Sequence, residues 1–105
     1  MLWVCDNVTK YEQFKIVFQE MHSKDTWIDI SKLPSEQLIE QGESILSHHS
    51  NACIFLGYLE PGWMLEPTHQ TLLRNLFRKF DVGFICKFVD SIPFSWKNEI
   101  EVLYS

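Results

Sequence analysis

The chain has 105 residues, of which 46% are hydrophobic and 14% aromatic, so it can form one folded domain and is too apolar to be disordered. Nine basic and fourteen acidic residues give a net charge of −5, which argues against nucleic acid as the main partner, because phosphate binding needs a basic surface. No apolar run reaches the roughly 18 residues that a membrane span needs, so no contact with a membrane is expected.

The three cysteines indicate a reducing compartment. Cys5, Cys53 and Cys86 each lie in an apolar run, and their odd number favours buried, reduced thiols over disulfides. The first six residues carry no basic side chain and already end on an acid, unlike a secretory signal peptide. Together these features predict a cytoplasmic protein.

The first half of the chain predicts two strands and two helices. A short apolar strand over Leu2–Cys5 is followed by a helix whose start is indicated by the Thr-x-x-Glu pattern of Thr9 and Glu12. A second strand is expected over Thr26–Ile30 and a second helix from Pro34. The inner stripe of the first helix would consist of Tyr11, Phe14, Val17, Phe18 and Met21.

The second half continues the alternation. Ala52–Leu59 is the most continuous apolar run and predicts a central strand. A third helix opens at Pro67, and further strands are expected over Val82–Phe88 and Ile100–Tyr104. The pattern predicts a single α/β domain over residues 1–105, a three-layer sandwich with a five-stranded, mainly parallel sheet. The helix that would cover the last strand is missing.

The loop after the central strand carries a family resemblance. Phe55-Leu56-Gly57-Tyr58-Leu59-Glu60-Pro61-Gly62 resembles the segment after the third strand of receiver domains, the flavodoxin-like modules of response regulators. The Pro-Gly pair falls where the family has it, and the position of the phospho-accepting aspartate is Gly57. The resemblance covers residues 1–88 and implies a flavodoxin-like fold.

The departures from the family pattern bear on function. Receivers hold Mg²⁺ with the aspartate nucleophile and two further acids, whereas this sequence keeps one of those acids and lacks the nucleophile. The resemblance therefore implies a degenerate phosphorylation pocket, with no cofactor and no catalysis. Its residues would be Asp6, Asn7, Gly57, Cys86 and Lys87.

Large apolar residues near the end of the chain predict a contact surface. Without a following helix, one face of the last strand is uncovered, and such a face favours a protein partner or a homodimer with Trp96 as the anchor. In the alternative, residues 91–98 fold back, shield the strand and leave a monomer. The expected partner-binding residues are Phe94, Trp96, Ile100, Val102 and Tyr104.

Two metal sites and a reactive thiol are further candidates. The histidines His48, His49 and His69 could join Cys53 around zinc, but no ligand spacing supports this. The segment from Val4 to Val8 faintly resembles the first motif of PIN-type nucleases. The matching acids would be Asp6, Asp29, Glu60 and Asp90, which do not follow that family's pattern. Cys86 beside Lys87 could be a reactive thiol, although a strand position favours a buried one.

The sequence thus predicts a non-catalytic pseudo-receiver, a regulatory module acting through protein contacts, with the N-terminal domain of a transcriptional regulator as one setting. The domain itself would bind no nucleic acid, metal or membrane. Two alternatives stay open: a free-standing small acidic adaptor or inhibitor protein, and a PIN-like metal-dependent nuclease.

Overall fold

Strands and helices alternate along the chain and form three layers in the computed structural model, which describes residues 2–86, Trp96 and the backbone of residues 100–103. Neighbouring strands are parallel in every pair of the sheet, and their order is β2-β3-β4-β1-β5. The predicted α/β class with a parallel sheet is confirmed. The strands are β1 (Leu2–Cys5), β2 (Trp27–Asp29), β3 (Cys53–Tyr58), β4 (Asp81–Ile85) and β5 (Ile100–Leu103).

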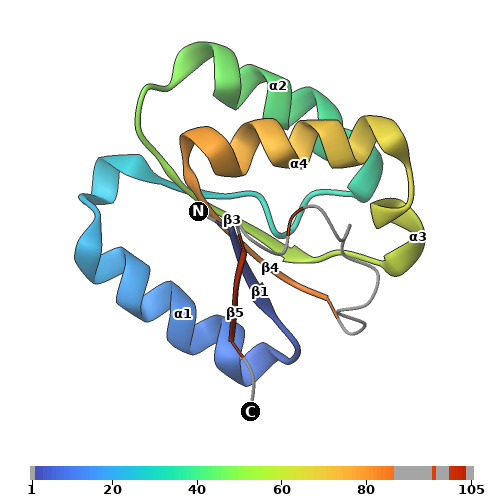
Figure 1. Cartoon of the computed structure of the whole chain (residues 1–105). Helices are drawn as coiled ribbons and strands as arrows, with labels where there is room; N and C mark the ends of the chain where they lie inside the picture. The colour runs from blue at the N-terminus through green and yellow to red at the C-terminus, as the bar shows by residue number, and fades with distance from the viewer. Residues whose placement is uncertain (1, 87–95, 97–99, 104–105) are drawn as a thin grey trace.

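The helices cover both faces of the sheet. Figure 1 shows α1 on one face and α2 and α4 side by side on the other. Short 3-10 turns precede β2 (Lys24–Thr26) and α2 (Ser35–Gln37). The helices are α1 (Val8–Met21), α2 (Leu38–His48), α3 (Pro61–Met64) and α4 (Pro67–Lys79).

The start of α1 differs from the prediction. Its N-cap is Asn7, whose side-chain oxygen accepts a hydrogen bond of 2.9 Å from the backbone N–H of Lys10. The helix therefore begins at Val8, one residue before Thr9. Thr9 lies inside the helix, so the prediction that Thr9 and Glu12 cap its start is wrong. Asparagine is as good an N-cap as serine or threonine, so the nearer capping residue sets the boundary.

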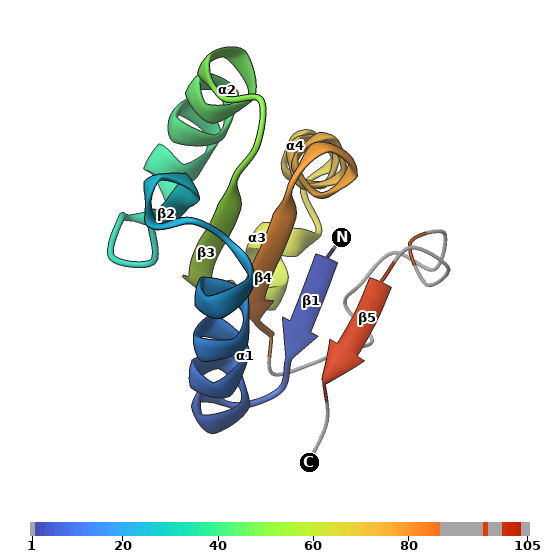
Figure 2. The same ribbon diagram turned by 90° about the vertical axis from the view of Figure 1, so that its left-hand side faces the viewer.

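The strand order differs from that of flavodoxin-like sheets, in which the first strand lies between the second and third. Figure 2 shows β1 between β4 and β5. Right-handed crossovers explain the helix placement, because the chain moves one way along the sheet from β1 to β2 and the other way from β2 through β4. The first connection therefore places α1 on one face, and the later ones place α2 and α4 on the other.

Between β4 and β5 the structure describes Cys86 and Trp96. Trp96 packs against Phe77 of α4 with ring centroids 5.3 Å apart. Its side chain is only 2% exposed. Trp96 therefore belongs to the hydrophobic core beneath α4.

The core has one part on each face of the sheet. The larger part joins β1, β3 and β4 to α2 and α4, and the smaller part joins them to α1. On the α1 face, Phe14 lies directly over Gly83 of β4, where an added Cβ would overlap the phenylalanine ring. Glycine in this strand thus allows helix and sheet to approach closely. The smaller part consists of Cys5, Tyr11, Phe14, Phe18, Cys53, Phe55 and Ile85.

The cysteines lie where the sequence predicts. Cys5, Cys53 and Cys86 are all buried, and none forms a disulfide. Burial raises the pKa of the Cys5 thiol to about 11, with the nearby Asp6 carboxylate adding to the effect. Burial likewise raises the pKa of Cys53 to about 12. These two thiols stay protonated at neutral pH and are poor nucleophiles.

Among the helices that the structure describes, none has the length and apolar character to cross a membrane.

Candidate functional site

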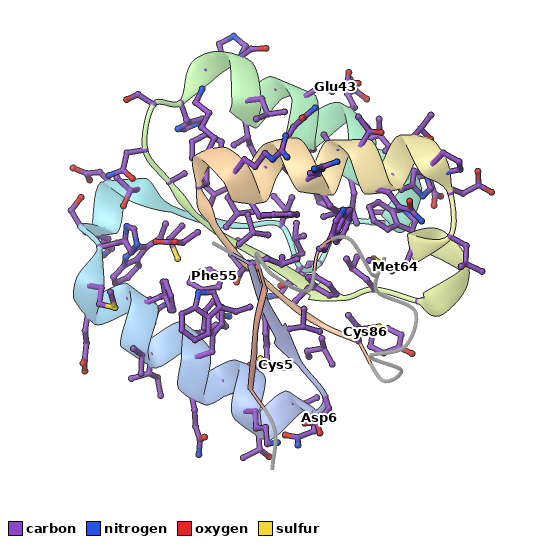
Figure 3. The ribbon with its side chains drawn as sticks, viewed as in Figure 1. Cys5, Asp6, Glu43, Phe55, Met64 and Cys86 are labelled. Carbon is purple, nitrogen blue, oxygen red and sulfur yellow. The ribbon has the colours of Figure 1, made fainter. Side chains whose placement is uncertain are left out.

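The carboxyl ends of the strands form the edge at which open α/β sheets bind ligands. The loop after β1 leads to α1 on one face, whereas the chain after β4 leads to Trp96 on the other. The adjacent strands β1 and β4 are thus followed by described residues on opposite faces of the sheet, which marks a topological switch point. Asp6 and Cys86 lie at this point, directly after β1 and β4 (Figure 3).

The carboxylate of Asp6 already has partners. Lys10 places its Nζ 3.2 Å from Asp6 Oδ1, one helical turn along the chain. The side-chain amide of Asn7 donates a hydrogen bond of 3.0 Å to the same oxygen. A carboxylate that is engaged by an ammonium group is a weak ligand for Mg²⁺, which binds through carboxylates and water. Asp6 and Asn7 therefore stabilise the first turn of α1.

Cys86 belongs to the sheet rather than to an open pocket. Its backbone N–H donates a hydrogen bond of 2.9 Å to the carbonyl oxygen of Cys5. Its side chain is fully buried in the larger part of the core. The interpretation of Cys86 as a buried strand thiol is supported, and Lys87, the last residue of the predicted pocket, lies outside the described residues.

The backbone conformation at position 57 requires glycine. The pairing of β3 with β4 shifts between Phe55 and Gly57, so Leu56 is the extra residue of a bulge. Gly57 has a φ of +75°, a conformation that other residues adopt only with strain. A Cβ there would lie 2.7 Å from the Cβ of Ser31. No side chain, and so no aspartate, fits at this position.

The predicted pocket is not assembled in the way that the resemblance implies. Strand β4 lies between β1 and β3, so Asp6 and Gly57 are separated by two strand spacings, about 10 Å. Gly57 pairs with Phe84, which pairs with Val4, so it lies inside the sheet, two residues short of Asp6 along the strand direction. Of the four pocket residues that the structure describes, Asp6, Asn7 and Cys86 lie close together and Gly57 lies apart from them.

A buried hydrogen bond at Gly57 was not predicted from the sequence. The hydroxyl of the buried Tyr11 accepts a hydrogen bond of 3.0 Å from the backbone N–H of Gly57. Burial, partly offset by this hydrogen bond, raises the pKa of the Tyr11 phenol well above its usual value. The phenol therefore stays protonated and completes the hydrogen bonding of the bulge. The predicted apolar stripe is correct for Tyr11, Phe14 and Phe18, which are buried, and wrong for Val17 and Met21, which are exposed. Nothing in the sequence revealed the hydrogen-bond partner of Tyr11.

Asp29 and Ser31 form a second group of polar contacts at the end of β2. The Asp29 carboxylate accepts hydrogen bonds from the Ser31 hydroxyl at 2.5 Å and from the Ser31 backbone N–H at 3.0 Å. Lys15 of α1 lies 3.1 Å from the other carboxylate oxygen. Partial burial opposes ionisation, but these hydrogen bonds and the lysine outweigh it and lower the pKa of Asp29. The network ties α1 to β2.

The other candidate sites are not assembled in the part of the chain that the structure describes. No group of three or more His, Cys, Asp or Glu residues there is arranged to hold a metal ion. His69 forms a hydrogen bond of 2.8 Å with the carbonyl oxygen of Trp63, and His48 one of 2.8 Å with that of Ser44. Asp29 is three strand positions away from Asp6, and Asp90 of the PIN-type set lies outside the described residues.

The predicted partner-binding residues differ in their placement. Trp96 is buried against α4, so it is not exposed as a partner anchor must be. Ile100 and Val102 pair along β5 with Leu2 and Val4 of β1. Phe94 and Tyr104 lie outside the described residues.

Exposed apolar side chains occur along the carboxyl edge. Tyr58 ends β3 and is 52% exposed, Leu65 follows α3 and is 66% exposed, and Val8 opens α1 and is 62% exposed. We call these three residues the carboxyl-edge surface. The sequence did not predict the exposure of Leu65 and Val8, which depends on where α3 and α1 begin and end.

Comparison with known proteins finds no family model that matches this sequence, and no significantly similar curated protein or solved structure.

Proposed function

We propose that this protein is a non-catalytic binding module whose protein partner contacts the carboxyl-edge surface. The observation that carries the proposal is the composition of the edge where α/β folds hold their chemistry. There the carboxylate of Asp6 is paired with Lys10, while Tyr58, Leu65 and Val8 are exposed. A site of this kind favours the burial of apolar surface over the binding of a charged substrate or metal.

The energetics of burial support a protein partner. Covering a large apolar side chain contributes about 1.5–3 kcal/mol, so three such residues supply a large share of a moderate affinity. Tyrosine is also enriched in the centres of protein interfaces. Glu60 and Glu66 are exposed in the same connection between β3 and α4. The favoured partner surface is therefore apolar, with basic residues around it.

We further propose a regulatory role for this module, which rests on the receiver resemblance, that is, on Pro61-Gly62 and the alternation of strands and helices. Pro61 is the first residue of α3, so the motif turns the chain from β3 toward α4. The strand order gives the resemblance no support. A degenerate receiver and an acidic adaptor or inhibitor would both bind through protein contacts, and an adaptor that depends on its acidic charge would lose affinity steeply with salt.

A capture experiment with matched variants tests the proposal. The chain, immobilised through its N-terminus, is exposed to extract of its native cells, and bound proteins are quantified by mass spectrometry. We expect Tyr58→Ser with Leu65→Ser to lose a partner that the unmodified chain retains. The control is Ile16→Ser with Val17→Ser, which changes two exposed apolar residues on the outer side of α1. Equal loss with both variants, or no specific partner, contradicts the proposal.

A further inference from the structure

A second surface, away from the carboxyl edge, lies between α2 and α4. These helices run parallel and side by side over one face of the sheet (Figure 1). Near their C-terminal ends, Nζ of Lys79 donates a hydrogen bond of 2.9 Å to the carbonyl oxygen of Leu46. On the outer side a groove of about 580 Å³ separates the two helices. We call it the α2–α4 groove.

Each wall of the groove is one face of a helix. Ile39, Glu43 and Leu46 line it from α2, spaced by four and then three residues. Thr68, Thr71 and Asn75 line it from α4, spaced by three and then four. Residues at these spacings share a helix face, so each wall extends over two turns, about 10 Å. The short side chains on α4 leave the groove hollow.

The shape favours a helix over a small molecule. A small-molecule site encloses most of its ligand, whereas Glu43, Thr68 and Thr71 are exposed and the groove is open on its outer side. A long open channel between two parallel helices receives the ridge of a third helix, the way in which amphipathic helices bind grooves. Ile39 and Leu46 are half-buried and offer apolar contacts at both ends of the α2 wall.

The charge selects the occupant. Among the described residues that line the groove, Glu43 alone is charged, and Figure 3 places it toward the outer side of the helical layer. Among the described residues, no cation forms an ion pair with its carboxylate. A helix with apolar residues on one face and a lysine or arginine beside them would complement the groove. We propose that the α2–α4 groove docks a cationic amphipathic helix of a protein partner.

Fluorescein-labelled peptides provide a direct test. The probe is a helical peptide of about 14 residues built from Leu, Ala and Lys, and its match carries Glu in place of Lys. Fluorescence anisotropy measures binding to the full chain. We expect saturable binding of the cationic peptide alone, and shifts of the α2 and α4 amides in ¹H–¹⁵N spectra. No saturation at about 1 mM cationic peptide, equal binding of both peptides, or shifts confined to other elements would overturn the proposal.

Matched variants separate the groove from the overall negative charge. Glu43→Lys should weaken binding of the cationic peptide about tenfold, because one attraction becomes a repulsion. Glu40→Lys makes the same charge change at an exposed α2 residue outside the groove and should leave affinity within about twofold. Equal weakening by both variants would overturn the proposal.

Filling the groove provides an independent arm. Thr71→Trp adds no charge and should weaken binding at least tenfold, whereas Gln41→Trp, at an exposed α2 position outside the groove, should not. Unchanged binding to a folded Thr71→Trp variant would overturn the proposal. If circular dichroism shows that this variant is unfolded, Thr68→Trp takes its place with the same expectation. The test uses residues distinct from the carboxyl-edge surface, so its outcome is independent of the function proposed above.

Discussion

Individual residues explain why the sequence resembles a receiver domain while the phosphorylation pocket of receivers is not assembled. Gly57 has the position of a missing nucleophile in the sequence, yet its conformation and its neighbour Ser31 leave no room for a side chain. The sequence shows that position 57 carries no acidic side chain. It does not reveal that the backbone at this position requires glycine. A backbone of positive φ depends on the bulge, which arises from tertiary pairing of β3 with β4.

Restoring the acid tests this interpretation. We expect Gly57→Asp to lower the free energy of unfolding by about 1–3 kcal/mol, because a non-glycine residue is strained at this φ. Gly57→Ala should lose a similar amount. Urea unfolding measures both. Neither variant should gain a phosphoryl group in acetyl phosphate with Mg²⁺, as judged by intact mass, and a stable, phosphorylated Gly57→Asp protein would show that the position faces an open pocket.

The Asp29 network predicts a pH dependence. Its pKa is lowered by folding, so its contribution to stability is present above its ordinary value of 3.8 and is lost as the pH falls through the lower folded value. Asp29→Asn should therefore be less stable than the unmodified protein at pH 7, and the difference should shrink below about pH 4. Urea unfolding across this range measures the difference. Asp25→Asn, at an exposed residue, is the control, and a difference independent of pH would contradict the account.

At the scale of elements, the contact of α1 with the sheet depends on Gly83. The sequence predicted both the helix and the strand, since each has its own apolar pattern. It did not reveal that Phe14 lies over Gly83, because a contact between segments so far apart in the chain leaves no local pattern. The sequence also did not predict α3. This helix is a single turn, too short for its apolar residues to be distinguished from those of a loop.

A double-mutant cycle measures this contact. Gly83→Ala should cost about 1–3 kcal/mol of unfolding free energy through overpacking against the ring. Phe14→Leu removes part of the ring's bulk, so adding Gly83→Ala to it should cost less than Gly83→Ala alone. The coupling energy is expected to exceed about 0.5 kcal/mol, as for residues in contact. Additive effects would mean that Phe14 does not pack on Gly83.

At the scale of the whole molecule, strand order was the least predictable feature. The alternation of strands and helices fixes the class and the parallel sense, but it is equally compatible with β1 beside β3 or beside β5. The chosen order separates Asp6 from Gly57 and buries Trp96 beneath α4. Because of these two effects, neither a phosphoryl-binding pocket nor an exposed tryptophan is the best candidate for the functional site. The carboxyl-edge surface takes their place.

The burial of Trp96 gives a prediction for stability and assembly. Trp96→Ala should lower the free energy of unfolding by about 3–5 kcal/mol, since it removes a core side chain packed on Phe77. The unmodified chain should sediment as a monomer of 12.5 kDa. A dimer that dissociates on Trp96→Ala without loss of stability would restore Trp96 as an interface anchor.

The proposed binding of a protein partner at the carboxyl edge has a direct test. Site-specific photo-crosslinking tests it most directly, with a benzophenone amino acid in place of Tyr58 and, as a control, in place of Ile16, which is also exposed but lies on the outer side of α1. In native cells the account predicts one dominant heterologous adduct from position 58 that is absent from position 16. No adduct from position 58, or the same adduct from both positions, would contradict it.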